Sequence, residues 1–344
     1  MFNVVSMDTM KAVRRQGTVE EKIPFRLGNK EFFAKKQIVN GEMHTLVFAK
    51  PVGEMITTAA GRKEMLEKVV LDVELGREQV PTLYQPIYQR MEDRNFPEVF
   101  DAKWILQGVV VFLEHIEGEE IKFGHIQAEQ GPIARIVTYA AGFEYTEDMV
   151  EYNKSFEMDT LDRSFGEGYN ALLNHIHFSP IMNFNYAADN KTAAQGEESD
   201  PLTLKVKKTI VRAQEDAAIK KRPGNVLLAS GVRKYDIENA MKEMQISGTS
   251  HASISGIDTI IYYDGWSVQV GKKEYTYPGV DPNKAYLIRP KRGFRELIKH
   301  DLRIDADNAD ISRLVEAQVV GRARRGVFAA PAQNVQEITL PARS

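Results

Sequence analysis

The chain has 344 residues, of which 43% are hydrophobic and 27% are charged, and its formal net charge is -3. This is a globular composition with enough apolar residues for one large core or two smaller ones. The chain as a whole lacks the basic excess that is typical of strong nucleic-acid binders. It contains no cysteine, which excludes disulfides, thiolate zinc sites and a cysteine nucleophile.

No targeting or membrane segment is expected. The first residues, MFNVVSMDTMKAVRRQG, lack the basic start and apolar core of a signal peptide. No window holds about 18 uninterrupted apolar residues, which is the length that a membrane span needs.

The N-terminal region is predicted to contain a β-hairpin. Asn40-Gly41 favours a type I′ turn, and the apolar runs Phe32-Phe33 and Leu46-Val47-Phe48 flank it. We therefore expect residues 1–53 to form an extension with its own hairpin.

An amphipathic helix and a proline-broken arm are expected next. Apolar residues recur at helical spacing over residues 62–75, and Gly76 follows as a helix-ending residue. Pro81, Pro86 and Pro97 then break the chain into short pieces, which suits an extended arm.

A second hairpin is predicted over residues 108–127. Val109, Val111 and Leu113 alternate on its first arm, and its turn lies at the acidic Glu117-Gly118-Glu119. A long two-stranded hairpin has little core of its own, so we expect it to pack on another surface.

The stretch from Ile133 to Asn174 is the most informative part of the sequence. A short apolar run leads into a helix of roughly eight turns, which Thr146 would cap and Pro180 would end. The apolar positions of this helix fall on two stripes that are offset by about two residues, which indicates a bend or two different contact surfaces. A polar helix of this length usually spans or supports something.

The rest of the chain is predicted to mix helices and strands, and it contains no internal repeat. After a polar loop at 185–203, we expect helices at 204–221 and 237–244, short strands at 226–229, 257–263, 267–270, 274–277 and 285–288, and longer strand-rich segments at 297–304 and 314–328. On propensity alone, residues 315–320 could instead be helical.

Two motifs invite a cofactor or metal interpretation. Gly166-Glu167-Gly168 matches the start of the G-x-G-x-x-A motif of dinucleotide-binding proteins. The motif lies inside the predicted helix, so we interpret Gly166 and Gly168 as bend points. His175 and His177 could supply two metal ligands in an extended chain, whereas in a helix their rings point to nearly opposite sides. A metal-dependent enzyme that uses His175 and His177 is a further alternative function.

The charged clusters are predicted to be mostly solvated. The acidic group at 305–310 fails the calcium-loop pattern, because Ala309 and Asp310 occupy the positions that need an oxygen ligand and a glycine. Acidic neighbours offset the basic groups at 205–208 and 220–222. A third basic group, 289–295 with Arg322, Arg324 and Arg325, could touch phosphate or an acidic patch on a neighbouring subunit.

The order of these segments resembles the major capsid proteins of tailed double-stranded DNA phages. Their fold is named after phage Hong Kong 97 and is shared by encapsulin shells. Residues 138–161 look like the start of the family's spine helix, and residues 206–244, with NVLLASGVRKYDIENAM, are similar to the helix, strand and helix after it. Residues 256–328 resemble the closing strands. The resemblance covers about 54–340 and rests on the ordered set, because no single motif is specific.

The resemblance implies an α+β fold in five parts. These are the hairpin-bearing extension at 1–53, an N-terminal arm at 54–107, an extended loop at 108–136, a peripheral domain with the spine helix at 137–185 and 290–340, and an axial α/β domain at 186–289. It also implies self-assembly as hexamers and pentamers into an icosahedral shell, with an encapsulin-type compartment as the alternative. It implies no enzymatic activity, cofactor or metal.

The implied partners are other copies of the chain, a separate scaffold protein, a portal, decoration proteins and packaged double-stranded DNA held without sequence specificity, but no membrane. The implied location is the virion, with synthesis in the host cytoplasm. The candidate assembly contacts are Glu117, Gly118, Glu119, Lys122, Arg292 and Arg295, and the candidate cap and bend of the spine helix are Thr146, Gly166 and Gly168. The near-neutral net charge fits a shell in which packaged DNA must move, because a strongly basic lining would hold it.

Some relatives cross-link a loop lysine to an asparagine on a neighbour. Lys122 and Asn308 lie in roughly suitable regions of this sequence, but we do not assign that chemistry to them.

Overall fold

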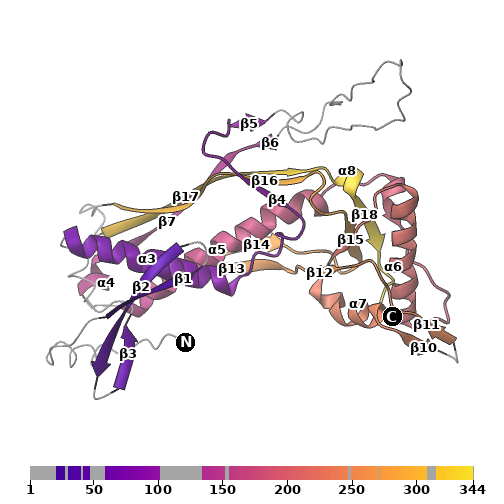
Figure 1. Ribbon diagram of the computed structural model, residues 1–344, viewed down its shortest axis with the longest axis horizontal. Coiled ribbons are helices and arrows are strands. Elements are labelled where there is room, and N and C mark those ends of the chain that lie inside the picture. Colours follow the sequence, from indigo (N-terminus) through magenta and orange to yellow (C-terminus); the bar gives the residue numbers. More distant parts are fainter. Residues whose placement is uncertain are drawn as a thin grey trace, which may run out of the picture. The chain divides into compact units, whose positions relative to one another are not determined.

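The computed structural model describes residues 21–27, 30–39, 42–46, 59–100, 134–151, 155–246, 249–270, 272–307 and 315–343. The described residues form two compact units. Unit 1 comprises those up to Pro81 with Tyr139–Asn170 and Leu302–Ala323, and unit 2 comprises Thr82–Thr138, Ala171–Asp301 and those from Arg324 onward. Three long elements contribute residues to both units, namely α5 (Ser155–Met182), β16 (Phe294–Asp307) and β17 (Val315–Ala329), which are labelled in Figure 1.

The N-terminal strands form an antiparallel sheet of their own. It consists of β1 (Glu21–Leu27), β2 (Lys30–Val39) and β3 (Glu42–Leu46), in that order. Val39 pairs with Glu42, so the predicted hairpin around Asn40-Gly41 is confirmed, although the turn itself lies outside the described residues. The sequence analysis missed β1, whose Pro24 is tolerated because β1 is an edge strand.

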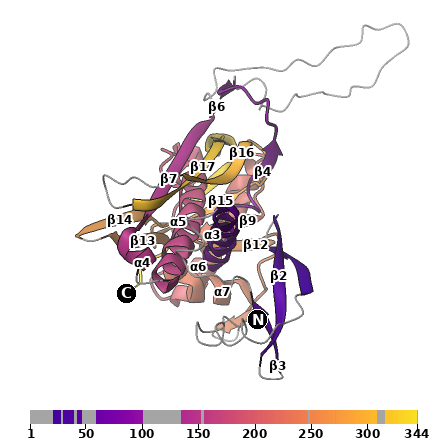
Figure 2. The same cartoon turned by 90° about the vertical axis from the view of Figure 1, so that its left-hand side faces the viewer.

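The first long helix is α3 (Ala59–Gln79), and the predicted apolar face is confirmed, since Met65, Val69 and Val73 are buried. The prediction that Gly76 ends this helix is wrong. Gly76 lies inside α3, where a Cβ atom would overlap the backbone carbonyl of Arg163 on α5. Gly166 on α5 faces the carbonyl of Val73 in the same way. The two helix backbones therefore touch at a reciprocal pair of glycines, and α3 runs beside α5 in Figure 2.

The long helix differs at both ends from its prediction. Strand β7 (Val137–Thr146) extends to Thr146, and α4 (Glu147–Glu151) follows it directly, so Thr146 has the position of a cap, but the cap itself stays a prediction. The prediction that Pro180 ends the helix is wrong, because α5 continues to Met182. A proline in the last turn of a helix removes only one backbone hydrogen bond, so the helix can continue past it. The N–H of Asn183 still donates to Ser179 O at 2.9 Å.

A four-stranded sheet has the order β4 (Gln89–Glu92), β16, β17 and β7. The strand predictions at 297–304 and 314–328 are confirmed, and the helical alternative for 315–320 is wrong. Buried Ala317 and Val319 alternate with exposed Val320 and Arg322, so the sheet environment overrides helical propensity.

The short strands β5 (Val99–Phe100) and β6 (Ala134–Arg135) pair antiparallel. Phe100 lies opposite Ala134, so the chain returns beside the point at which it left. The hairpin predicted at 108–127 lies between these strands and outside the described residues.

The main sheet of unit 2 has five strands in the order β12 (Thr259–Tyr262), β9 (Val226–Ala229), β15 (Lys284–Ile288), β18 (Val335–Thr339) and β8 (Lys191–Thr192). It is mixed: β12–β9 and β18–β8 are parallel pairs, and β15 is antiparallel to both neighbours. The strands predicted at 226–229 and 285–288 are confirmed, whereas β8 and β18 were not foreseen.

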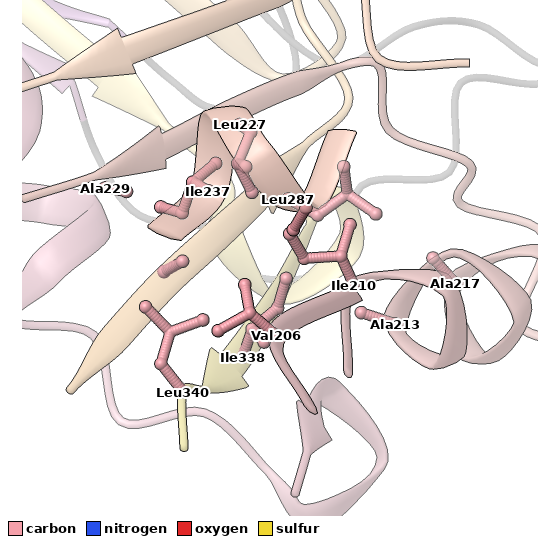
Figure 3. Packing of buried hydrophobic residues seen from close by; sticks show 12 residues of the cluster. Val206, Ile210, Ala213, Ala217, Leu227, Ala229, Ile237, Leu287, Ile338 and Leu340 are labelled. Carbon is pink, nitrogen blue, oxygen red and sulfur yellow. The ribbon is translucent and has the colours of Figure 1, made fainter. Parts of the chain in front are cut away.

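Helices α6 (Leu202–Ile219) and α7 (Lys234–Met241) pack on one face of this sheet, and Figure 3 shows the apolar side chains between them. The fully enclosed part of this core consists of Val206, Ile210, Ala213, Ala217, Leu227, Ala229, Ile237, Ala240, Ala285, Leu287, Ile338 and Leu340. On the opposite face of β15, the Tyr286 hydroxyl lies 3.5 Å from Met182 O of α5.

The prediction that Met244 belongs to the second of these helices is wrong. Helix α7 ends at Met241, and Met244 begins β10 (Met244–Ile246), which pairs with β11 (Thr249–His251). The buried ammonium of Lys207 donates to Ala240 O at 3.0 Å and to Lys242 O at 2.6 Å. These bonds satisfy the carbonyls at the end of the helix and stop it there.

The remaining elements of unit 2 are short. The hairpin of β13 (Gly265–Val270) and β14 (Lys273–Pro278) matches two predicted strands. Single turns occur at η2 (Ala188–Asn190), η3 (Gly231–Arg233) and α8 (Pro331–Asn334). No helix within the described ranges combines the length and apolar character needed to cross a membrane.

The reciprocal glycine contact predicts a position-specific effect of alanine. Gly166→Ala should destabilise the protein by about 1–3 kcal/mol, because its methyl group has to displace the α3 backbone. Gly168→Ala on the same helix is the matched control, and it should be neutral or stabilise by up to ~1 kcal/mol through helix propensity. Urea denaturation measures both, and equal effects of the two variants would contradict the proposed contact.

Candidate assembly site and its buried polar clusters

The predicted assembly residues fall into two groups. Glu117, Gly118, Glu119 and Lys122 lie outside the described residues. Arg292 lies on the turn between β15 and β16 and is exposed, whereas Arg295 is the second residue of β16 and is half-buried. Arg295 donates to Lys291 O, and also to Phe294 O at 3.3 Å. Burial lowers the pKa of Arg295 from its ordinary value.

The third basic group of the sequence does not form one surface. Arg325 is buried and forms ion pairs with Glu296 and Asp301, and Arg322 pairs with Asp305 on the neighbouring strand. The expectation that Arg325 belongs to a contact with phosphate or another subunit is therefore wrong, whereas for the exposed Arg322 it stays a prediction. Each has a carboxylate partner brought to it by strand pairing, which the sequence does not reveal.

Glu296 is the centre of a buried polar cluster in unit 2. Its Oε1 accepts hydrogen bonds from Tyr84, at 2.9 Å, and from Arg325. His177 Nε2 lies 3.6 Å from the same oxygen, and the His177 ring stacks on Tyr84 with 3.6 Å between ring centroids. The cluster ties the arm segment after Pro81, helix α5 and the strands β16 and β17 together.

His177 is held in its neutral form. Its Nδ1 lies 2.6 Å from Leu173 O, which suits a neutral ring that donates from Nδ1. Burial lowers the pKa of His177 to about 3, with a further contribution from the charge of Arg325, while the Leu173 hydrogen bond acts in the opposite direction. A neutral ring avoids a second buried cation beside Arg325.

The structure does not bring His175 and His177 together as a metal pair. His177 is fully buried, whereas His175 is half-buried and stacks on Tyr277 of β14 with ring centroids 4.7 Å apart. Both residues are helical, and their rings contact different elements, as the sequence analysis expects of a helix. Among the described residues, no three His, Cys, Asp or Glu side chains are grouped to hold a metal ion.

A second polar cluster lies between α3, α5 and β7 in unit 1. Asp162 is fully buried, and its Oδ1 accepts a 2.7 Å hydrogen bond from Tyr145. Its Oδ2 has no hydrogen-bond partner within the described part of the chain. Nearby, Lys68 pairs with Asp72 at 2.7 Å and with Asp159.

Burial is the largest influence on Asp162, and it raises the pKa of this carboxyl to about 7. The Tyr145 hydrogen bond and the charge of Lys68 act in the opposite direction, while Asp72 and Asp159 raise the pKa further. The carboxyl therefore titrates near neutral pH, although Tyr145 and Lys68 both favour its ionised form.

Glu296 and Asp162 are the notable residues that the sequence analysis missed, while Arg325 was named but expected at the surface. A weak signal was present for both missed residues. Glu296 lies in register with buried Phe294 and Ile298 on one face of a strand, and Asp162 lies four residues after buried Met158 on a helix. A charged residue on an apolar stripe indicates a buried polar group. The pattern does not reveal the hydrogen-bond partners of that group, because they lie far away in the sequence.

Known proteins match this chain in structure alone. No family model and no curated protein matches it. The virus-like particle from Pyrococcus furiosus is 12% identical, with a TM-score of 0.49 over 80% of this chain and 99% of the other. The capsid of cyanophage P-SCSP1u is 9% identical, with a TM-score of 0.46 over 76% and 89%. The SrpI encapsulin complex from Synechococcus elongatus PCC 7942 is 9% identical, with a TM-score of 0.44 over 78% and 91%. These scores do not favour a phage capsid over an encapsulin.

The low pKa of His177 predicts that acid weakens unit 2. The unfolded chain binds a proton at His177 below about pH 6.5, and the folded chain does so only near pH 3. The contribution of the neutral His177 ring to the free energy of unfolding is therefore fully present above pH 6.5, and it is lost as the pH falls. Between pH 7 and pH 4.5, the wild type should lose about 2 kcal/mol more than His177→Gln. Urea titrations at both pH values measure this difference. His175→Gln, at a more exposed site, is the control, and parallel losses in all three proteins would refute the assignment.

The raised pKa of Asp162 predicts the opposite slope. The unfolded carboxyl ionises near pH 3.8 and the folded one near pH 7, so stability is lost as the pH rises through this window. Between pH 5 and pH 8, the wild type should lose about 2 kcal/mol more than Asp162→Asn, which keeps the oxygen that accepts from Tyr145. Asp148→Asn, at an exposed site on α4, is the control. A constant difference between wild type and Asp162→Asn would contradict this prediction.

Proposed function

We propose that this chain is a structural shell protein with the Hong Kong 97-type capsid fold. In this proposal, it assembles as hexamers and pentamers into the icosahedral capsid of a tailed double-stranded DNA phage. The observation that carries the proposal is the order of elements in the described chain. The described elements follow the order that the capsid resemblance implies. They are, in turn, an arm helix, the paired strands β5 and β6, the long helix α5, a five-stranded sheet with two helices, and two long strands.

The physical demands on a shell subunit support the proposal. One sequence must fit both five-fold and six-fold rings, which calls for parts with separate cores that are joined by continuous elements. The described chain has two units with separate cores, and α5, β16 and β17 contribute residues to both. The contacts between subunits can each be weak, because closure of a shell sums many of them.

The finer assignments belong to this proposal. The five-part division, the loop contacts of Glu117, Gly118, Glu119 and Lys122, and the contacts of Arg292 and Arg295 are proposed roles. So are the cap at Thr146 and a bend at Gly166 and Gly168, although Gly166 also has the packing role described above. The proposed partners are other copies of the chain, a separate scaffold protein, a portal and decoration proteins, and the proposed location is the virion.

An encapsulin-type compartment is the alternative, and both functions are non-enzymatic in this proposal. The two differ in what assembly requires. A compartment shell closes from its own subunits, whereas the proposed capsid needs a separate scaffold protein to reach a uniform size.

The proposal predicts that the purified 38.9 kDa chain forms large assemblies. Light scattering after size-exclusion chromatography and negative-stain microscopy would measure their size and symmetry. Uniform icosahedral shells from the chain alone would favour the compartment, and irregular shells that become uniform with scaffold would favour the capsid. A chain that stays monomeric with scaffold, at high concentration and at high salt, would overturn the shell proposal.

A further inference from the structure

Five cationic side chains gather on two adjoining turns of unit 2. They are Lys221, directly after α6, Arg289, Lys291 and Arg292, between β15 and β16, and Arg295, at the start of β16; we name this group the basic surface. The guanidinium of Arg289 donates to Lys221 O at 3.3 Å, which joins the two turns, and Arg295 donates to Lys291 O. The pKa of Arg289 is lowered by burial and by the charge of Arg292, so these two arginines are close neighbours.

None of the cations of the basic surface has a carboxylate partner among the described residues, whereas several cations elsewhere on unit 2 do. Lys220 pairs with Asp189 at 2.9 Å, and Lys208 pairs with Asp200 at 2.7 Å. Arg289 and Arg295 donate only to backbone carbonyls. Five unpaired positive charges are therefore grouped here, although the chain as a whole is slightly acidic.

The backbone supports the same interpretation. Lys221 and Lys291 have φ angles of 57° and 61°, and they are the only non-glycine residues of the described chain with positive φ. Glycine adopts this conformation without steric cost, and it is the usual residue directly after a helix, where Lys221 lies. Backbone strain at two lysines of one surface points to a role for their charge, because neither position needs a lysine to form its turn.

The chemistry of the surface favours phosphate over an acidic protein segment. Besides the five cations, the two turns hold prolines, glycines, the buried Phe294 and a sixth cation, Arg222, whose guanidinium is used in hydrogen bonds to Gln336 and Asn190. An interface with another protein usually has an apolar centre, and these turns expose none. They also hold no exposed aromatic side chain on which unpaired bases could stack. Guanidinium groups match the geometry of phosphate oxygens, and lysines add point charges.

We propose that the basic surface binds the phosphate backbone of double-stranded nucleic acid without sequence preference, which gives Arg292 and Arg295 this role in place of the subunit contact named above. This inference rests on the proposed function, because it makes the surface the contact between a shell subunit and its nucleic-acid cargo. The binding is weak for each copy and sensitive to salt, because it depends on the release of counterions from a few phosphates. Such a contact lets the cargo move, which a basic lining over the whole subunit would prevent.

Full-length protein should be titrated into a fluorescein-labelled 20-base-pair duplex at several salt concentrations, with anisotropy as the readout. The test variant is Lys221→Gln, Lys291→Gln, Arg292→Gln, which changes three exposed side chains. The matched control is Lys191→Gln, Lys208→Gln, Lys234→Gln, which also removes three charges, but from residues that have carboxylate partners. Thermal melting checks that both variants fold, and Arg292→Gln alone serves if the triple variant does not.

The wild type should bind the duplex with a Kd on the order of 10⁻⁴–10⁻⁶ M and lose affinity steeply with salt. The test variant should lose about tenfold in affinity at low salt, and its salt slope should fall by roughly 0.9 for each phosphate contact removed. The control variant should keep both values within about twofold.

Equal losses in the test and control variants would overturn the inference, as would the absence of duplex binding at low salt. Tighter binding of polyglutamate than of duplex would also overturn it and identify an acidic protein segment as the partner. Microscopy of the same preparations keeps the two proposals distinguishable. Shells without duplex binding refute the basic surface alone, and a chain that never assembles refutes the shell.

Discussion

The close crossing of α3 and α5 constrains unit 1 more than any other contact. Gly76 and Gly166 allow the two helix backbones to touch, and polar groups between the helices are then cut off from water. Asn170 accordingly donates to Arg77 O at 2.7 Å and to Val80 O at 2.9 Å, which satisfies carbonyls at the end of α3. A slightly wider crossing would admit water and remove the need for these bonds, so the glycines determine which polar side chains must have partners.

Both units bury a titratable group, but the two groups respond to pH in opposite directions. Acidification neutralises the carboxyl of Asp162 and so favours the core of unit 1, while it works against the neutral ring of His177 in unit 2. The slopes partly cancel in the free energy of unfolding of the whole chain. The balance between the units nevertheless shifts, because each core has its own titrating group. In a protein with separate cores, pH can therefore change which unit opens first without changing the total stability much.

An element could be predicted from the sequence where neighbouring residues determine it, and could not where residues far along the chain do. The apolar spacing of α3 and α6 and the buried run of β9 were read correctly, because burial of one face leaves a periodic pattern in the sequence. Gly76 was misread because its role depends on a carbonyl of Arg163, far along the chain. Glu296 was missed for the same reason, since Tyr84 and Arg325 reach it from distant segments. Of the predicted contact residues, only Arg292 and Arg295 lie in described segments, so most of the candidate site stays a prediction.

The net charge of the chain turned out to be a poor guide to its surface, because charge here is organised by pairing. In unit 2, carboxylates lie beside Lys208, Lys220 and Lys234, so these cations are largely compensated where they stand. The small net charge therefore does not imply a uniformly neutral surface. Charges are paired at these sites, whereas the cations on the turns around Lys221 and Lys291 have no carboxylate partner among the described residues. The proposed shell subunit with its proposed basic surface would use this arrangement, since uniform basicity would make identical copies repel one another.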